Sequence, residues 1–204
     1  MMGRFIVLEG GEGAGKSSVQ RLLGERLSAA GAPLALTREP GGTPFGEAIR
    51  TMLLSQRSLD DPLAELLLFE SARAHLVRKV IKPALERGQL VLCDRFTPSS
   101  IAYQGYGRGL GRALVERANL IATGGLEPDL VLLLDLAPDE GLARRAAGGG
   151  ANHFDREALA FHERVRKGYL ELARDDPARW RVIDAGQPIE AVVEQCHAAL
   201  QGHV

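Results

Sequence analysis

The chain has 204 residues, of which 45% are hydrophobic and 25% are charged, so we expect one domain with a full core. The formal charge of −1 argues against a broad nucleic-acid-binding surface, and no apolar stretch approaches the length of a membrane span. Cys93 and Cys196 lack metal-ligand spacing, and the start of the chain runs directly into a predicted strand. These features favour a cytoplasmic protein.

A phosphate-binding pattern occupies residues 5–18, FIVLEGGEGAGKSS. Its four leading apolar residues predict a strand buried on both faces, and the residues that follow match G-x-x-x-x-G-K-[ST]. Glycines let backbone N–H groups turn inward, where they bind phosphate together with the positive end of the next helix. Lys16 would neutralise a transferring phosphate, and Ser17 would ligate Mg²⁺. The pattern predicts nucleotide binding and leaves the reaction open.

After this loop, apolar residues at helical spacing predict a helix that ends at Gly31, and residues 34–37 suit a short strand. Arg38 and Glu39 follow that strand directly. In a doubly wound sheet this position faces the ligand-binding edge, so both side chains are candidates for the site. A solvated loop is the alternative interpretation.

Apolar spacing predicts two further helices, over residues 44–55 and 60–87, with Pro83 kinking the second helix near its end. Phe69 and Arg73 are four residues apart on this second helix. They therefore share a face, where an aromatic plane and a guanidinium group could meet one ligand. A core phenylalanine beside a surface arginine is the alternative.

Residues 90–93 predict another buried strand, and Asp94 and Arg95 follow it. Beside a phosphate loop, the carboxylate can hold Mg²⁺ and the guanidinium can bind phosphate through two hydrogen bonds. A structural Asp–Arg pair is the competing interpretation. The segment 98–112 is rich in Ser, Gly, Tyr and Arg, so it is either the wall of a polar pocket or a glycine-rich connector.

The remaining chain alternates between helices and strands, which predicts an α/β fold with a mainly parallel sheet. A short helix carries Arg144 and Arg145, and the three adjacent glycines after it suggest a mobile lid at about residues 144–156. A surface loop is the alternative. The other expected elements are a helix at 112–123, a strand at 130–135, a helix at about 155–174, a strand at 181–183 and a helix at 189–200.

The order of these segments resembles the bacterial thymidylate kinases, which are P-loop nucleoside monophosphate kinases, over nearly the whole chain. The motifs that carry the resemblance are FIVLEGGEGAGKSS, TREPGGTPFGEAIR, LLLFESAR, DRFTPSSIAYQGYGRG, PDLVLLLDLAPDEGL and GYLELA. The resemblance implies a single P-loop domain over residues 1–204 with a five-stranded parallel sheet, a helical lid and a homodimer. It also implies transfer of the γ-phosphate of ATP to dTMP with Mg²⁺, which gives dTDP and ADP.

The same resemblance assigns residues to the two substrates. The ATP phosphate site would comprise Gly10, Gly11, Glu12, Gly13, Ala14, Gly15, Lys16, Ser17 and Ser18, with Ser17 and Asp94 serving Mg²⁺. The acceptor site would comprise Glu12 at the sugar, Phe69 stacked on thymine, Arg73 bonded to the base, Arg38, Arg50 and Arg95 at the phosphate, and Ser99, Ser100, Tyr103 and Gln104. Residues 185–187 lie where the family seats adenine.

One departure from the family pattern concerns the lid. Members whose phosphate loop lacks an arginine usually supply the transition-state cation from an arginine-rich lid, and the loop here has Glu12 and Gly13. The lid, however, reads RRAAGGGANHFD, with Asn152 and His153 where an Asp-Arg pair is common. We therefore expect Arg144 or Arg145 to act in catalysis, and the sequence does not choose between them.

Two other functions are compatible with the phosphate loop. An enzyme of the same fold could use a different nucleoside or nucleoside monophosphate as acceptor, and a nucleotide switch would hydrolyse slowly and have no acceptor. The Asp94–Arg95 pair, the pairing of Phe69 with Arg73, and the glycine lid favour a kinase with two substrates.

Overall fold

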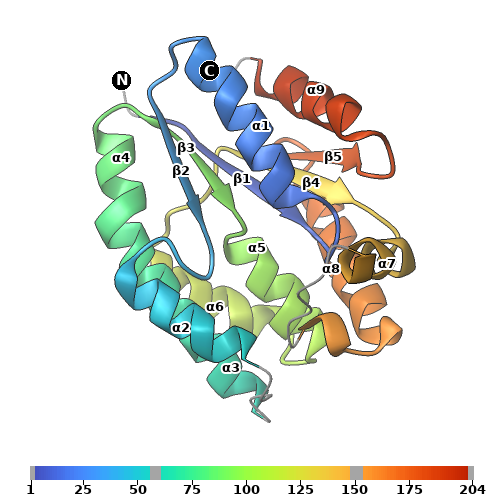
Figure 1. Ribbon diagram of the computed structural model, residues 1–204. Helices are drawn as coiled ribbons and strands as arrows, with labels where there is room; N and C mark the ends of the chain where they lie inside the picture. The colour runs from blue at the N-terminus through green and yellow to red at the C-terminus, as the bar shows by residue number, and fades with distance from the viewer. Residues whose placement is uncertain (1–2, 56–60, 148–153, 202–204) are drawn as a thin grey trace.

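The computed structural model describes residues 3–55, 61–147 and 154–201, and its centre is a five-stranded sheet in which every strand pair is parallel (Figure 1). The strands are β1 (Phe5–Gly10), β2 (Leu34–Arg38), β3 (Leu90–Asp94), β4 (Leu130–Asp135) and β5 (Trp180–Asp184), in the order β2-β3-β1-β4-β5. The helical segments are α1 (Lys16–Ala29), α2 (Pro44–Leu54), α3 (Pro62–Leu76), η1 (Val77–Ile81), α4 (Lys82–Glu86), α5 (Thr97–Ser100), η2 (Ile101–Gly107), α6 (Arg112–Thr123), α7 (Pro138–Ala147), η3 (Phe154–Arg156), α8 (Leu159–Asp175) and α9 (Ile189–Leu200). The predicted parallel α/β fold is confirmed, and none of the described helices is long and apolar enough to cross a membrane.

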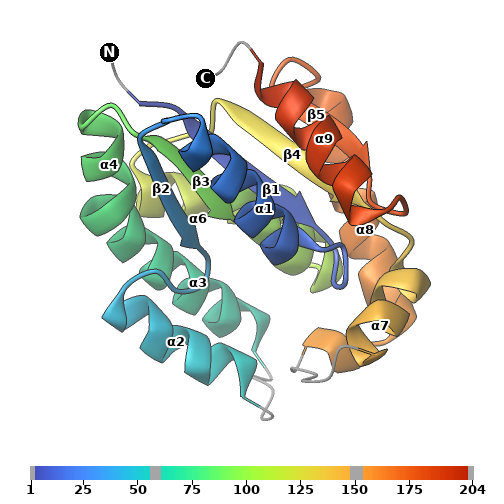
Figure 2. The same cartoon turned by 45° about the horizontal axis from the view of Figure 1, so that its top comes forward.

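Strand β1 is buried on both faces, as its apolar run predicted. Ile6 and Leu8 pack with α1 and α9 on one face, whereas Phe5 and Val7 pack with the helical stretch from α3 to α4 on the other. Successive side chains of a strand point to opposite faces, so a strand in the middle of three layers must be apolar throughout. Figure 2 shows α1 and α9 together over one face of the sheet.

The helix expected over residues 60–87 is three consecutive segments, α3, η1 and α4. Its start follows a sequence signal, because the carboxylate of Asp61 accepts the N–H groups of Leu63 and Ala64 at 2.8 and 3.2 Å. Segment η1 is a π-helix that lies just before Pro83. Proline has no N–H to donate to the preceding turn, so the disturbance expected near Pro83 takes the form of a widened turn.

The segment after β3 is helical, which the sequence did not predict because serine and glycine are poor helix formers. Helix α5 continues into the π-helix η2, and most of η2 is buried. A Cβ atom at Gly107 would lie 2.6 Å from the ring of Phe161, so glycine is needed where η2 packs on α8. A second difference is that α8 begins at Leu159, after the short 3-10 helix η3, rather than near residue 155.

The register of the strands brings their carboxyl ends together. Asp94 of β3 is level with Leu8 of β1 and Arg38 of β2, and Gly10 of β1 is level with Leu134 of β4. The loops that follow β1, β2 and β3 therefore leave the same edge of the sheet. This edge is where parallel α/β sheets bind their ligands.

A buried charge cluster fixes α3 beneath this edge. The guanidinium of Arg73 is 1% exposed, and its Nε donates to Glu39 at 2.8 Å while NH1 donates to Glu70 at 2.5 Å. NH1 also lies within hydrogen-bond distance of Ser100 and Asn119, and NH2 donates to the carbonyl oxygen of Phe96 at 3.1 Å. The cluster thus ties β2, α3, α5 and α6 together.

The cluster holds two carboxylates against one guanidinium, and the outer oxygens of Glu39 and Glu70 have no hydrogen-bond partner among the described residues. Burial outweighs the attraction of Arg73 and raises the pKa of Glu39 to about 7. The folded protein therefore binds a proton at Glu39 more tightly than the unfolded chain does. A proton held there removes the excess negative charge of the cluster.

We predict that this proton makes folding depend on pH. For a carboxyl group whose pKa is raised in the folded state, the stabilisation is complete below the ordinary pKa of about 4.5 and is lost as pH rises through about 7. The free energy of unfolding of the native protein should therefore fall, relative to that of Glu39→Gln, by on the order of 3 kcal/mol between these pH values. Urea unfolding of both proteins across this range measures the difference. Parallel pH profiles would contradict the prediction.

Candidate active site

The phosphate loop joins β1 to α1 and leaves the first helical N–H groups open to a ligand. Gly15 precedes α1 in the left-handed conformation, with φ 86°, and no side chain caps the helix. Lys16 donates its ammonium to the carbonyl oxygens of Gly10 and Gly11 at 3.0 and 2.8 Å. Burial and the nearby Arg95 lower the pKa of Lys16 to about 8. Open N–H groups and a buried ammonium make this end of α1 an anion site.

Gly13 is where the loop touches α7. Its φ is 71°, and a Cβ atom there would lie 1.9 Å from the carbonyl oxygen of Gly141. A Cβ atom at Gly141 would in turn lie 2.2 Å from the carbonyl oxygen of Glu12. Two backbones that approach this closely leave no room for a side chain, so an arginine at Gly13 would push α7 away. Position 13 therefore has no space for a cationic side chain, and Lys16 is the cation of this loop.

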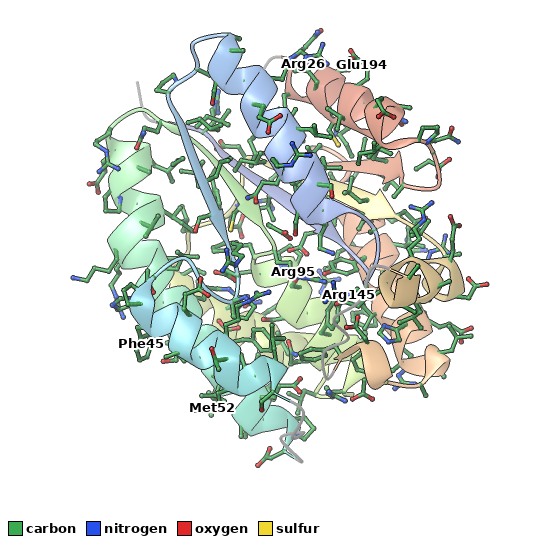
Figure 3. The ribbon with its side chains drawn as sticks, in the orientation of Figure 1. Arg26, Phe45, Met52, Arg95, Arg145 and Glu194 are labelled. Atoms are coloured by element: carbon green, nitrogen blue, oxygen red, sulfur yellow. The ribbon has the colours of Figure 1, made fainter. Side chains whose placement is uncertain are left out.

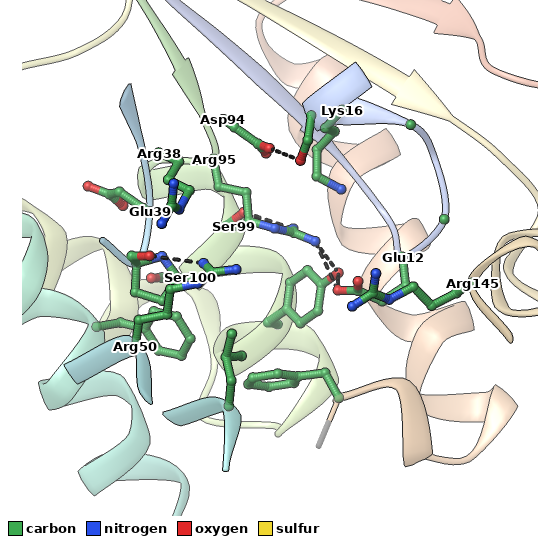
Figure 4. A pocket seen from close by; sticks show the side chains of 18 of the residues that line it. Glu12, Lys16, Arg38, Glu39, Arg50, Asp94, Arg95, Ser99, Ser100 and Arg145 are labelled. Carbon is green, nitrogen blue, oxygen red and sulfur yellow. Dashed lines mark hydrogen bonds and ion pairs between the residues drawn. The ribbon is translucent and has the colours of Figure 1, made fainter. Parts of the chain in front are cut away.

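Ser17 and Asp94 form a pair of oxygen ligands across the β1–β3 edge. The hydroxyl of Ser17 donates to the carboxylate of Asp94 at 2.7 Å (Figure 4). Both oxygens are hard donors of the kind that Mg²⁺ prefers, and Mg²⁺ takes its other ligands from water and phosphates. No group of three or more His, Cys, Asp or Glu side chains among the described residues could hold a metal. A two-ligand site completed by a nucleotide therefore fits this chain.

Arg95 is the most connected side chain of the site. NH1 donates to Gly10 O, Ser99 Oγ and Tyr169 Oη at 3.2 Å each, and NH2 donates to Glu12 and Tyr103 at 2.9 and 3.1 Å. Its backbone has a left-handed φ of 73°, which costs free energy and is held in place by these contacts. Burial alone would raise the pKa of Glu12, but Arg95 and Lys16 lower it to about 2. Glu12 and Arg95 are therefore both charged.

Glu9 and Tyr169 support Arg95 from behind, and sequence reasoning missed both. The carboxylate of Glu9 accepts the N–H of Phe96 at 2.9 Å, the hydroxyl of Ser99 at 2.7 Å and the hydroxyl of Tyr169 at 2.8 Å. Burial raises the pKa of Glu9. The position of Glu9, a carboxylate directly after the apolar residues of β1, could have predicted that it lies at the site. Tyr169, which comes from α8, lies in the motif GYLELA, but its spacing from the phosphate loop gave no reason to place it at the site.

The phosphate loop, Asp94 and Arg95 line one cavity of about 390 Å³, and Glu9 and Tyr169 lie outside its lining. Of the residues expected at the site, the cavity is lined by Glu12, Gly13, Gly15, Lys16, Ser17, Ser18, Arg38, Arg50, Phe69, Asp94, Arg95, Ser99, Ser100, Tyr103, Gln104, Arg144 and Arg145. Glu39, the candidate that follows Arg38, lines it as well, and so do Pro40, Leu54 and Phe154, which were not expected. Gly10, Gly11 and Ala14 belong to the loop without lining this cavity. In Figure 3, Arg95 and Arg145 lie in the middle of the molecule, below the sheet edge.

Arg73 does not line the cavity, which differs from the expected contact with a base. Its Nε and both terminal nitrogens already donate to protein acceptors, and its guanidinium lies behind Ser100. Phe69, one turn earlier on α3, does reach the cavity. Phe69 and Arg73 share a helix face, as predicted. Arg73 is buried because Glu39 and Glu70 pair with it, and the sequence pattern does not show these partners.

The two arginines of α7 point to different places. Arg144 donates to the carbonyl oxygen of Ala185 at 2.8 Å and to Glu140 at 2.5 Å. Arg145 lies beside Glu12 (Figure 4). Its Nε is 3.3 Å from both carboxylate oxygens of Asp155. Asn152, His153 and the glycines of the expected lid lie outside the described residues. Arg145 is thus the arginine nearer to the phosphate loop carboxylate.

Comparison with known proteins identifies the family. The thymidylate kinase family model matches residues 8–196. Thymidylate kinase of Thermomicrobium roseum is 52% identical over 200 residues, covering 98% of this chain and 95% of that protein, and thymidylate kinase of Deinococcus radiodurans is 48% identical, covering 98% of each. The crystal structure of thymidylate kinase from Ehrlichia chaffeensis superposes with a TM-score of 0.81 at 34% identity, over 98% of this chain and 99% of that one. The fold and these matches together place the chain in the thymidylate kinase family.

Proposed function

We propose that this protein transfers the γ-phosphoryl group of ATP to dTMP, which gives dTDP and ADP and serves dTTP synthesis. The observation that carries the proposal is a single cavity with two anion sites. Lys16 and the start of α1 form one site, and Arg38, Arg50 and Arg95 line the other part of the same cavity. A nucleotide switch needs only the first site, whereas a kinase needs a phosphate of each substrate in one enclosure.

The donor phosphates would lie on the loop 10–18 and the first turn of α1. On binding, Lys16 would exchange its two carbonyl contacts for phosphate oxygens. Ser17 and Asp94 would hold Mg²⁺, which neutralises phosphate charge when bound. Arg144 contacts Ala185 O, at the loop 185–187 where we place adenine, so it would hold α7 to that loop.

The acceptor phosphate would be bound by Arg38, Arg50 and Arg95. Its second pKa is about 6, so near neutral pH it is already mostly dianionic and needs no strong general base. In the structure Arg38 pairs with Glu47 at 2.8 Å and Arg50 donates to the carbonyl oxygen of Pro40 at 3.0 Å. These contacts hold both guanidinium groups at the cavity until the substrate arrives. Catalysis would then rest on alignment and charge neutralisation.

The nucleoside of the acceptor would lie between the phosphate groups and Phe69. Phe69 offers a stacking face for any pyrimidine, and the amide of Gln104 lines the same cavity. The acids and hydroxyls nearer Arg95 would contact the sugar, namely Glu12, Ser99, Ser100 and Tyr103. Arg73, which we expected at the base, would act from the second layer by holding Ser100 at 3.0 Å.

The lid, about residues 144–156, would close over the phosphates and exclude water. We assign the transition-state cation to Arg145, because it lines the cavity beside Glu12, whereas Arg144 is directed to the 185–187 loop. Arg145 is held by Asp155 at the far end of the same lid. Arg145 would then supply the positive charge that a side chain at position 13 cannot, because Gly13 packs against Gly141.

We also propose that the protein is a cytoplasmic homodimer. Cys93 and Cys196 are buried and not disulfide-bonded, which suits a reducing compartment. Leu67 on α3 and Ile121 on α6 are 56% and 84% exposed, and these two helices pack side by side. A second copy that covers this side would bury them. Phe45 and Met52 on the outer side of α2 extend the apolar surface (Figure 3).

The function is tested by a coupled assay of ATP against dTMP, dUMP and dCMP. We expect kcat/KM to be highest for dTMP, lower for dUMP by roughly 1 to 3 kcal/mol of transition-state binding, and lowest for dCMP. The thymine methyl group adds only apolar contact, whereas cytosine leaves polar groups of the site unpaired. Equal use of dCMP and dTMP would refute the acceptor assignment. ATP hydrolysis without phosphoryl transfer to any acceptor would favour a nucleotide switch.

The lid assignment predicts different defects for Arg145→Ala and Arg144→Ala. An arginine that acts in the transition state contributes on the order of a thousandfold in turnover, so Arg145→Ala should lower kcat by about that factor. Arg144→Ala should mainly raise the KM for ATP. Steady-state kinetics of the single and double variants separate these effects. Native turnover in the double variant would exclude both residues and direct attention to Arg156 or His153.

Arg95→Ala should damage phosphoryl transfer far more than ATP binding, because Arg95 is assigned to the acceptor phosphate. Loss of one charged donor should cost on the order of 2 to 4 kcal/mol of transition-state stabilisation. Single-turnover rates and ATP binding by calorimetry give the two quantities. The matched control is Arg112→Ala, an exposed arginine paired with Glu116 and Asp175, which should leave both unchanged. Small and equal losses of transfer rate and of ATP affinity in the Arg95 variant would mean that Arg95 has a structural role.

A further inference from the structure

Glu65 of α3 is a buried acid that contacts the cavity wall from behind. Glu65 and Gln104 are each 1% exposed, but only Gln104 lines the cavity. The amide nitrogen of Gln104 donates to Oε1 of Glu65 at 2.8 Å. The neighbouring residue, Tyr103, lines the same cavity and binds Glu12 and Arg95. Glu65 is therefore joined to the site through a single amide.

Arg108 keeps the carboxylate of Glu65 in place. Its Nε and NH2 lie 3.3 and 3.1 Å from the two oxygens of Glu65, and NH1 donates to Glu157 at 2.6 Å. The guanidinium also lies 4.8 Å from the ring centre of Phe161. Both oxygens of Glu65 therefore accept hydrogen bonds from the guanidinium, and a carboxylate paired in this way serves its neighbours as an acceptor.

The carboxylate of Glu65 accepts hydrogen bonds, and this determines which end of the Gln104 amide faces the cavity. The NH₂ group of Gln104 must point to Glu65, because the reversed amide would set two buried oxygens against each other. The amide oxygen of Gln104 is then the end left for the cavity, and it has no side-chain or backbone donor among the hydrogen bonds of the described residues. Gln104 therefore presents an acceptor to whatever base lies there.

We propose that Glu65 is a positioning residue that sets base specificity by holding the Gln104 amide with its oxygen towards the base. The proposal rests on the acceptor site assigned above. Thymine and uracil carry an N–H at the 3-position and match this oxygen, whereas cytosine carries a bare acceptor nitrogen there and opposes it. Arg73 does not provide this discrimination directly, since its nitrogens already donate to Glu39, Glu70 and Phe96.

The decisive variant is Glu65→Gln. An introduced amide can donate as well as accept, so it allows Gln104 to reverse and to offer its NH₂ group to cytosine. The ratio of kcat/KM for dTMP to that for dCMP should fall ~10- to 100-fold, the range expected for one buried unmatched hydrogen bond. The ratio for dTMP to dUMP should stay unchanged, because both bases have the same N–H. A purely structural defect would lower all three activities and leave both ratios as they are.

Gln104→Met is the matched second variant. It removes the amide at similar volume and should also lower the dTMP:dCMP ratio, and adding Glu65→Gln to it should change the ratio no further. If Gln104→Met leaves the ratio at the native value, the base does not lie at Gln104 and the acceptor site is wrong. If Gln104→Met lowers the ratio but Glu65→Gln does not, the acceptor site stands and the positioning role of Glu65 is refuted.

Arg108→Met gives an independent test if Glu65→Gln does not fold. Without the guanidinium, the carboxylate of Glu65 loses the two contacts that hold it against Gln104, so the amide is no longer fixed in one orientation. The dTMP:dCMP ratio should fall in this variant, and the dTMP:dUMP ratio should not. A native dTMP:dCMP ratio in Arg108→Met would count against the proposal.

Discussion

The guanidinium of Arg95 is the contact on which the rest of the site depends. It binds the carbonyl oxygen that ends β1, the acid of the phosphate loop and hydroxyls from η2 and α8, so four separate parts of the chain meet at one cation. This arrangement is possible because β1 and β3 are neighbours in register, with Leu8 level with Asp94. The left-handed backbone of Arg95 is held by the same contacts. A substrate phosphate would bind to a cation that is already positioned.

Basic side chains predominate at the cavity, and acidic side chains predominate in the layer behind it. At the cavity, Lys16, Arg38, Arg50 and Arg95 outnumber the acids, which suits phosphates. Deeper in the protein the balance reverses, because Arg73 meets Glu70 and also Glu39, which reaches from the cavity lining, and burial raises the pKa of Glu39 to about 7. Unpaired charge is costly away from water, so each arginine in this layer has acidic partners. The second layer therefore gives rigidity to the side chains that line the cavity.

The phosphate loop and α7 are in close contact, and the two arginines of α7 reach different places. Gly13 and Gly141 approach too closely for a side chain, so any further cation over the phosphates must come from the lid itself. Arg145 lies beside Glu12, and Arg144 reaches the loop after β5. These two adjacent residues therefore reach different parts of the chain, because successive side chains on a helix diverge by about 100°.

The sequence by itself determined the parallel α/β fold, the phosphate loop and the residues at the strand ends, because buried strands and glycine-rich turns are local patterns and strand ends meet at one edge. Other lining residues, such as Arg50, were expected from the family resemblance. The sequence did not determine the helical form of η2, the burial of Arg73 or the roles of Glu9, Tyr169 and Glu65. Each of these depends on partners distant in sequence, such as the pairing of Arg73 with Glu39 or of Gln104 with Glu65. A charged side chain is equally compatible with a ligand site and with a buried pair. Only the tertiary structure decides between them, because only it sets which opposite charge lies within reach.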